Sequence, residues 1–313
     1  MSVPHPDFRV AAVVVTFNRP VLLKRCIESL LDQTHALTEI IVVDNAGIED
    51  NKDDIVGLSG NINYIKLVHN VGGAGGFHFG LREAFKTSAD AVILMDDDGF
   101  PERSAIEQLV VVMTTRELGV VNCLVLDEDA RDELCFEMPY AGEVINDLPA
   151  ARRLSVDGIL ENRVGAFNGT MISRSTFEKV GNIKAECFIW GDETEYVMRA
   201  RRMGVEMATV VGAHQFHPRA RGDLVQLKPF APVRIPPQQR SHYFYRNLGF
   251  IRFHYMSFSS FLKGGVSYFI TLTLKVGIGE ALKCTMYYID GALDTYRLTP
   301  SRSTLLAKIP DSN

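Results

Sequence analysis

Short apolar runs alternate with helical patterns along the first hundred residues. Val10–Val15 is a continuous apolar run, which is typical of a strand buried on both faces. Pro20 opens a helical pattern, because proline costs little at the first position of a helix. Three more strands and one more helix are predicted: Ile40–Val43, Tyr64–Val68 and Ala91–Met95 as strands, and Phe79–Phe85 as a helix. Strands that alternate with helices indicate parallel βαβ units, so the sequence predicts an α/β fold with a mostly parallel sheet flanked by helices.

The second hundred residues are less regular. From Arg116 to Val164 the pattern predicts no regular elements, and the acidic stretch Asp127–Glu133 indicates a loop. The periodicity then resumes, with a strand predicted at Phe167–Ser173, a helix at Asp192–Met203 and a last strand at Val205–Val211. Acidic residues begin that helix and arginines end it, which suits the helix dipole.

Polar side chains gather where the predicted strands end. The first strand is followed by Thr16, Asn18 and Arg19, the second by Asp44 and Asn45, the third by Asn70 and a run of glycines, and the fourth by Asp96, Asp97 and Asp98. In an open parallel sheet, ligands bind outside the carboxyl ends of the strands. Four successive strands therefore deliver polar groups to one predicted binding edge.

Three adjacent carboxylates, Asp96 to Asp98, repel one another unless a cation offsets their charge. A hard divalent cation does so, bound through one or two carboxylates and the phosphates of a substrate. In an extended segment Asp96 and Asp98 point the same way and Asp97 points opposite, so the outer two form the predicted metal-side pair. A solvated acidic turn is the alternative, but the position directly after an apolar strand favours the metal.

Two further features at this edge have two interpretations each. The segment from Asn70 to Phe77 holds four glycines, which allow a close approach of the backbone to a phosphate, or simply a flexible connection between strand and helix. It matches neither the dinucleotide fingerprint nor a Walker A loop. Asp44 can accept hydrogen bonds from a base or ribose, or can cap an Asx turn.

A second acidic group follows the only tryptophan, Trp190. Asp192 and Glu193 are candidates for a general base that takes a proton from a substrate hydroxyl. Glu195 is assigned to a structural pair with Arg199, four residues further along the helix. His214 and His217 follow the last predicted strand and are metal-ligand candidates only if a metal site exists.

Composition narrows the class of protein. The chain has 313 residues, 46% of them hydrophobic and 23% charged, with a formal net charge of −5. This excludes a disordered chain and disfavours a nucleic-acid binder. The five cysteines are scattered without a C-x-x-C pair, and we expect no signal peptide, so a cytoplasmic location is predicted. The longest uncharged apolar stretch, Gly264–Leu274, is too short to span a membrane.

The balance of charge changes after His217. From Pro218 to Asp290 there are ten Lys or Arg residues and three Asp or Glu residues, together with many aromatic residues. We therefore predict a domain boundary near residue 225, with a domain over residues 1–225 that carries the predicted binding edge and a helical region over residues 226–313. That region suits either the surface of an anionic membrane or contacts within a homo-oligomer.

In this order the motifs resemble those of glycosyltransferase family two, the inverting enzymes of the GT-A fold. The matching segments are VVVTFNRP (Val13–Pro20), VVDN (Val42–Asn45), NVGGAGGF (Asn70–Phe77), MDDD (Met95–Asp98), IWGDETEY (Ile189–Tyr196), the histidine region, and SHYFYRN (Ser241–Asn247). The resemblance covers residues 8–220, and the glycine and aspartate motifs look most like those of bacterial galactofuranosyltransferases.

The resemblance implies roles for individual residues. The metal, Mn²⁺ or Mg²⁺, would be held by Asp96, Asp98 and His217, the last chosen over His214 from its register after Gly204. Glu193 would be the base, with Asp192 as the alternative, and Trp190 would contact the acceptor. The implied donor-binding residues are Thr16, Asn18, Arg19, Asp44, Asn70, Gly72, Gly73, Gly76 and Asp97.

The implied reaction transfers galactofuranose from UDP-galactofuranose to a glycan, with a lipid-linked glycan as the expected acceptor, in the synthesis of a bacterial surface polysaccharide such as O-antigen. The enzyme would be peripheral at the inner face of the cytoplasmic membrane. The alternatives are a rhamnosyltransferase that uses dTDP-rhamnose, and a non-catalytic scaffold that binds sugar nucleotides. A nucleotidyltransferase would prefer a glycine-rich loop directly after the first strand, where this chain has TFNRP.

Overall fold

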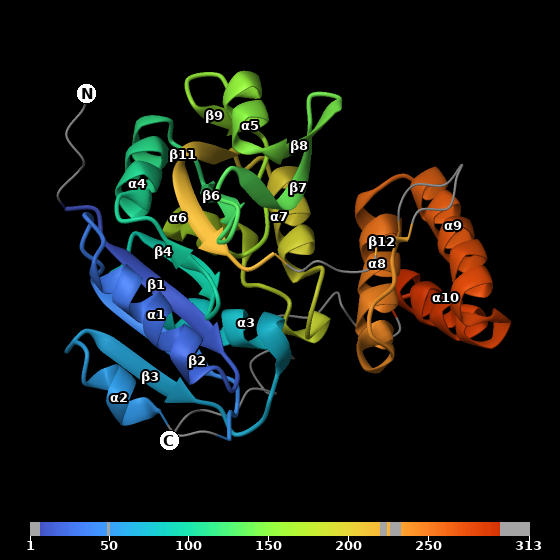
Figure 1. The fold of residues 1–313 in the computed structure, drawn as a ribbon, viewed down its shortest axis with the longest axis horizontal. Coiled ribbons are helices and arrows are strands. Elements are labelled where there is room, and N and C mark those ends of the chain that lie inside the picture. Colours follow the sequence, from blue (N-terminus) through green and yellow to red (C-terminus); the bar gives the residue numbers. More distant parts are fainter. Residues whose placement is uncertain (1–6, 49–50, 220–223, 226–232, 295–313) are drawn as a thin grey trace. The chain divides into compact units, whose positions relative to one another are not determined.

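The computed structural model describes residues 7–48, 51–219, 224–225 and 233–294. Within them the chain packs as two compact units. The first comprises residues 7–182 and 200–219, and the second comprises residues 183–199 and 224–294. The predicted boundary near residue 225 stays a prediction. Figure 1 labels the helices and strands of both units.

The first unit begins with the alternation that the sequence predicts. In chain order its elements are β1 (Val10–Thr16), α1 (Pro20–Leu31), β2 (Glu39–Asp44), α2 (Lys52–Val56), β3 (Ile62–Lys66), α3 (Gly72–Ala84), β4 (Ala91–Asp96), β5 (Phe100–Pro101) and α4 (Ala105–Thr115). All seven residues of β1 are buried, because helices cover both faces of a parallel sheet. Helix α1 buries one stripe, formed by Leu23, Cys26, Ile27 and Leu30.

The segment without predicted elements is also regular. It forms β6 (Val120–Asp127), β7 (Glu133–Tyr140), β8 (Glu143–Asp147), α5 (Leu148–Leu154) and β9 (Ile159–Glu161). The unit is completed by β10 (Thr170–Ser173), α6 (Arg174–Val180), the end of α7 (Asp192–Arg202) and β11 (Met207–His217). The acidic stretch from residue 127 to 133 is the turn between β6 and β7, as predicted.

The sheet is mixed, and its main order is β3-β2-β1-β4-β10-β6-β11-β5. Strands β3, β2, β1 and β4 are parallel neighbours. Strand β10 runs antiparallel to both β4 and β6, and β11 is parallel to β6. Because β10 is antiparallel to both of its neighbours, β6 runs in the same direction as β4. The carboxyl ends of β1, β2, β4, β6 and β11 therefore meet at one edge of the sheet. The predicted α/β fold is confirmed, with β10 as an antiparallel insertion.

Three predicted boundaries are wrong by more than two residues, and one of them is the start of the strand predicted at Phe167, which the structure places at Thr170. The glycine-rich segment is itself the first turn of α3, which begins at Gly72 and not at Phe79. Strand β11 continues to His217, past the predicted end at Val211, with a register shift between Val210 and His214. The prediction ended too early because the last residues of β11 include polar residues and histidines, which do not form an apolar run.

The second unit contains the 3-10 turn η1 (Ala185–Cys187), the start of α7, β12 (Leu224–Val225), β13 (Val233–Arg234), the 3-10 turn η2 (Gln238–Arg240) and three helices. The helices are α8 (Ser241–Tyr255), α9 (Phe258–Val276) and α10 (Ile278–Ala292). Their shared core consists of Tyr245, Leu272, Ala281, Cys284 and Tyr288. The predicted C-terminal helical region is thus confirmed. Among the described residues, none of the helices is long and apolar enough to cross a membrane.

Candidate active site

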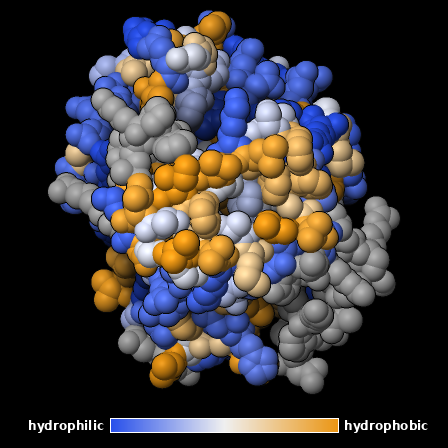
Figure 2. Space-filling model, turned by 90° about the vertical axis from the view of Figure 1, so that its right-hand side faces the viewer, coloured by the Kyte–Doolittle hydropathy of each residue, from blue (hydrophilic) through white to orange (hydrophobic). Residues whose placement is uncertain are grey.

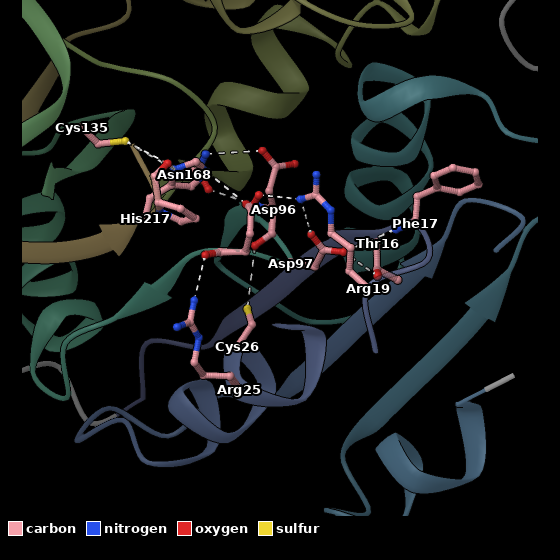
Figure 3. A network of polar contacts seen from close by, with 12 residues as sticks. Thr16, Phe17, Arg19, Arg25, Cys26, Asp96, Asp97, Cys135, Asn168 and His217 are labelled. Carbon is pink, nitrogen blue, oxygen red and sulfur yellow. Dashed lines mark hydrogen bonds and ion pairs between the residues drawn. The ribbon is translucent and has the colours of Figure 1, made fainter. Parts of the chain in front are cut away.

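Three side chains that the sequence analysis assigns to a metal lie together at the carboxyl edge of the sheet. Asp96 ends β4, Asp98 lies two residues beyond, and His217 ends β11 (Figure 3). One ligand atom from each lies within 4.8 Å of the others. His214 is elsewhere: its Nδ1 is 2.8 Å from Oε2 of Glu102. Sheet topology therefore brings His217, and not His214, to the acidic pair.

The imidazole of His217 is oriented through both of its nitrogens. Nδ1 lies 2.8 Å from the carbonyl oxygen of Pro218, and Nε2 lies 3.0 Å from Oδ1 of Asp98. Burial lowers the pKa of His217, but hydrogen bonds with Asp98 and Cys135 outweigh it and raise the pKa to about 10. Without a metal, a proton on this ring thus supplies positive charge beside Asp98. A donor Nδ1 leaves Nε2 as the nitrogen that faces the carboxylates.

Asp97 and Asp98 lie in a turn after β4, not in the extended segment that the sequence analysis assumes, and the carboxylate of Asp97 reaches the end of β1. Its Oδ2 accepts a hydrogen bond of 2.7 Å from the hydroxyl of Thr16 and one of 3.4 Å from the backbone N–H of Phe17. Burial raises the pKa of Asp97, while Thr16 and Arg19 oppose the shift. The carboxylate thereby joins the end of β4 to the end of β1, which fixes the loop that carries Asp98.

Arg19 bridges the two carboxylates. Its Nη1 lies 3.2 Å from Oδ1 of Asp97 and 2.5 Å from Oδ2 of Asp98, while half of its side chain stays exposed. Although burial raises the pKa of Asp98, His217 and Arg19 together lower it below its ordinary value. Arg19 and His217 thus both contact Asp98 at this edge of the sheet.

Asn168 is a contributor that the sequence analysis missed. Its Oδ1 accepts from the backbone N–H of Asp96 at 3.3 Å, and its Nδ2 donates to Oδ2 of Asp96 at 3.4 Å. Asn168 is buried and lies just before β10, the antiparallel insertion. The sequence analysis did not recognise Asn168 as a site residue, because the apolar residues around it led to the prediction of a strand. Only the three-dimensional pairing of β10 with β4 brings it to Asp96.

Asp44 lines a small hollow beside the metal-side group. The hollow is bordered by Thr16, Asn18, Arg19, Pro20, Asp44, Gly47, Asn51 and Tyr64. Oδ1 of Asp44 accepts from the N–H of Gly47 at 2.7 Å, and Oδ2 accepts from the hydroxyl of Tyr64 at 2.9 Å. The Asx-type contact is therefore present, and Tyr64, which the sequence analysis placed only as a strand residue, belongs to the wall of the hollow.

Asn70 and the glycines form the entry to α3. Oδ1 of Asn70 accepts from the N–H of Gly72 at 2.8 Å, and Asn45 ties the same turn to the end of β2. Gly72 has a φ of +74°, which a side chain would disfavour. A Cβ on Gly76 would lie 2.6 Å from Cγ1 of Val15, whereas one on Gly73 would meet nothing within 4 Å. Part of the glycine content thus serves close packing of the helix on the sheet.

The candidate bases lie in the second unit, at the start of α7. Asp192 is buried and Glu193 is half-buried. Glu195 is fully buried, and its carboxylate accepts two hydrogen bonds of 3.0 Å from Arg199 and one of 2.6 Å from the hydroxyl of Tyr255. The structural role predicted for Glu195 is confirmed, and Glu193 is the more accessible of the other two acids.

The loop before α7 is held by α8. Nδ2 of Asn247 lies 2.8 Å from the carbonyl oxygen of Cys187 and 2.7 Å from that of Trp190, and Arg246 also reaches the carbonyl of Cys187. Phe188 and Trp190 both have a φ of +62°, unusual for residues with large side chains. The Arg-Asn pair of SHYFYRN therefore positions the backbone of the segment that leads to the candidate bases.

The donor set at Asp96, Asp98 and His217 suits a divalent cation. Carboxylate oxygens are preferred by Mg²⁺, and a mixture of carboxylate and imidazole also suits Mn²⁺. The structure adds a geometric indication, because one ligand atom from each of the three side chains lies within 4.8 Å of the others. The residues present therefore fit the cation that the resemblance implies.

Comparisons with known proteins agree with this geometry. The mixed sheet flanked by helices is of the GT-A type, and solved structures share this fold. They include GalNAc-T7 with UDP, GalNAc and Mn²⁺ (TM-score 0.59, 14% identity, 90% of this chain and 55% of that one). TarS residues 1–349 of S. aureus gives a TM-score of 0.59 at 12% identity, over 92% of this chain and 82% of that one.

The family follows from the sequence itself. Residues 11–175 match the model for glycosyl transferase family 2, and the chain belongs to that family. Galactofuranosyltransferase GlfT1 of Mycolicibacterium smegmatis is 29% identical over 77% of this chain and 82% of its own length. GlfT1 of Mycobacterium tuberculosis is also 29% identical, over 77% of this chain and 81% of its own. A dTDP-rhamnosyl transferase, RfbF of Shigella flexneri, is 25% identical over 63% of this chain and 64% of its own.

Proposed function

We propose that this glycosyltransferase transfers galactofuranose from UDP-galactofuranose to a glycan acceptor, with inversion at the anomeric carbon and with Mn²⁺ or Mg²⁺ bound. The observation that carries the proposal is the group formed by Asp96, Asp98 and His217 in a family-2 chain whose relatives include GlfT1. We further propose a lipid-linked glycan of a bacterial surface polysaccharide as the acceptor, presented at the cytoplasmic face of a membrane.

The residues at the sheet edge would bind the donor. Asp44 and Tyr64, next to Thr16 and Asn18, line a small hollow at the edge where the uracil and ribose would bind. The first turn of α3 presents N–H groups and the positive end of the helix dipole, which favours the diphosphate. A cation held by Asp96, Asp98 and His217 would neutralise charge on the departing diphosphate.

Glu193 would act as the base, with Asp192 as the alternative. The carboxylate accepts the proton of an acceptor hydroxyl while that oxygen forms a bond to the anomeric carbon. The bond from the same carbon to the diphosphate oxygen breaks, and its electron pair leaves with UDP. Trp190 lies two residues before Asp192 and would contact the acceptor sugar. Substitution of Glu193 by Gln and of Asp192 by Asn identifies the base, because only loss of the base should abolish turnover while donor binding persists.

The test is a calorimetric titration of the protein with UDP, dTDP and UDP-galactofuranose, with and without Mn²⁺. We expect UDP binding that depends on Mn²⁺ and that is lost in Asp98→Ala. Asp157→Asn is the matched control, because Asp157 is an exposed carboxylate that pairs only with Arg116 among the contacts that the structure gives it. A folded protein that binds neither nucleotide in the presence of metal would contradict the proposal and leave the non-catalytic scaffold as the alternative.

A rhamnosyltransferase that uses dTDP-rhamnose is the second candidate. The similarity to RfbF of Shigella flexneri is the observation in its favour. The same titration separates the two, because a clear preference for dTDP over UDP would support the rhamnosyl reaction. Turnover with UDP-galactofuranose, followed by the anomeric configuration of the product in NMR spectra, would support the galactofuranosyl reaction.

A further inference from the structure

Exposed apolar side chains are concentrated on helices α9 and α10. Along α9 they recur every four residues at Phe258, Leu262 and Val266, and further apolar residues lie near its end. Along α10 they recur at intervals of three or four. The set, called here the outer apolar surface, comprises Phe258, Leu262, Val266, Leu274, Ile278, Leu282, Met286, Ile289 and Leu293.

This surface is separate from the side chains that hold the second unit together. Leu272, Ala281, Cys284 and Tyr288 form the core and are almost fully buried, while Met286 is 64% exposed. Each helix thus has one buried apolar face and a second one that faces solvent. Figure 2 shows hydrophobic side chains gathered over these helices in a broad band. A water-facing apolar band of this kind marks a surface for another apolar phase or partner.

The charges beside this surface are basic on α9. That helix carries Lys263 and Lys275, both exposed, and contains no acidic residue. Helix α10 carries the exposed Lys283, which pairs with Glu280 at 3.8 Å, and also Asp290, so of these two helices only α9 has an excess of positive charge. The chain as a whole has a formal net charge of −5, so the basic character of α9 is local. Lysines next to an apolar face are the pattern of a helix that lies on an anionic lipid surface.

We propose that the outer apolar surface docks on an anionic membrane, with α9 and α10 lying in the interface and not crossing it. Neither helix is long and apolar enough to span a bilayer. A second copy of the chain is the competing occupant, and the oligomeric state in solution distinguishes the two. The proposal does not depend on which sugar nucleotide is the donor.

The test is sedimentation of the full chain with vesicles. The vesicles are pure phosphatidylcholine in one series and three parts phosphatidylcholine to one part phosphatidylglycerol in the other. We expect binding to the anionic vesicles that is at least about tenfold tighter than to the neutral ones and that weakens in 1 M NaCl. The variant Leu282→Glu/Met286→Glu should bind at least about tenfold more weakly than the unaltered chain.

Controls keep the outcome informative. Val156→Glu places one such charge at an apolar side chain that is 64% exposed in the first unit, and it should bind vesicles like the unaltered chain. Far-UV circular dichroism and UDP binding check that each variant is folded. A second variant, Lys263→Glu/Lys275→Glu, should lose the preference for anionic lipid.

Three results would overturn the proposal. The first is a folded full chain that fails to sediment with anionic vesicles. The second is an unchanged affinity for vesicles in Leu282→Glu/Met286→Glu. The third is a dimer in solution that these substitutions dissociate, without vesicle binding in the unaltered chain, which would assign the surface to a second copy.

Discussion

Substitution of the glycines of α3 tests how closely this helix packs against the sheet. A Cβ built on Gly80 would lie 2.3 Å from Cγ1 of Val13 and 3.1 Å from Cγ2 of Val43. Both valines are fully buried in the centre of the sheet, so neither can yield easily. Gly73 lies in the same helix, and a Cβ there would meet nothing within 4 Å. The two positions therefore separate helix propensity from steric exclusion.

At Gly80, alanine has two effects of opposite sign on the free energy of unfolding. Alanine at Gly80 gains about 1 kcal/mol of helix propensity, but overpacking a rigid core costs about 1–3 kcal/mol, and a contact of this closeness belongs at the upper end. We therefore expect Gly80→Ala to lower the free energy of unfolding by about 1–2 kcal/mol, or the melting temperature by about 2–8 °C. Gly73→Ala should raise the free energy of unfolding by about 0.5 kcal/mol, because it restricts only the unfolded chain.

The assay is urea unfolding of the two variants and the unaltered chain, followed by far-UV circular dichroism. Asn70, Gly72 and the phosphate-facing turn are unchanged in Gly80→Ala, so UDP binding by the folded protein should persist. The reasoning fails if Gly80→Ala is as stable as the unaltered chain, or if the two substitutions shift the midpoint in the same direction.

Three other substitutions test single contacts. Asn168→Ala should weaken Mn²⁺ binding by about tenfold or more in calorimetry, because Asp96 loses the side chain that orients it, whereas the fold should survive. Tyr64→Phe should lower the free energy of unfolding by about 1–2 kcal/mol in urea, since the buried carboxylate of Asp44 loses a donor, and an unchanged midpoint would contradict this. Asn247→Ala should lower kcat of the folded fraction, because it frees the loop before the candidate bases; a change in stability alone, with kcat intact, would make the contact purely structural.

Much of the sheet could be predicted from apolar runs because its central strands are buried on both faces. β1, β2 and β4 each fall within one or two residues of the prediction. The same reasoning gave nothing between residues 116 and 164, although β6 there is buried along its whole length, with Asn122 inside its apolar run, while β7 mixes buried and exposed positions. The antiparallel insertion of β10 was also invisible, since strand direction leaves no mark on hydrophobic periodicity.

Some residues of the candidate site could likewise be predicted from the sequence, and others could not. Asp96 and Asp98 were paired from the alternation of an extended segment, whereas the structure has a turn at Asp97 and Asp98, and the sheet topology explains why His217 joins them. Asn168 and Tyr64 could not be found, because their relevance depends on which strands become neighbours in space. The local sequence therefore identified the charged residues at the carboxyl edge of the sheet. The residues that orient those charged side chains could be identified only from the three-dimensional structure.

The motif HYFYRN illustrates how a sequence pattern acquires a physical meaning only in the structure. Two residues of the loop before α7, Phe188 and Trp190, have backbone conformations that cost about 1–3 kcal/mol each for such side chains. Both rings are held by α8: Phe188 stacks on Tyr243 with centroids 4.4 Å apart, and Trp190 meets Phe244 edge-on at 5.7 Å. Asn247 holds the backbone of the same loop from the next turn of α8. Aromatic and amide contacts from one motif therefore offset strain at one loop, and that loop leads directly into the residues proposed to accept the proton.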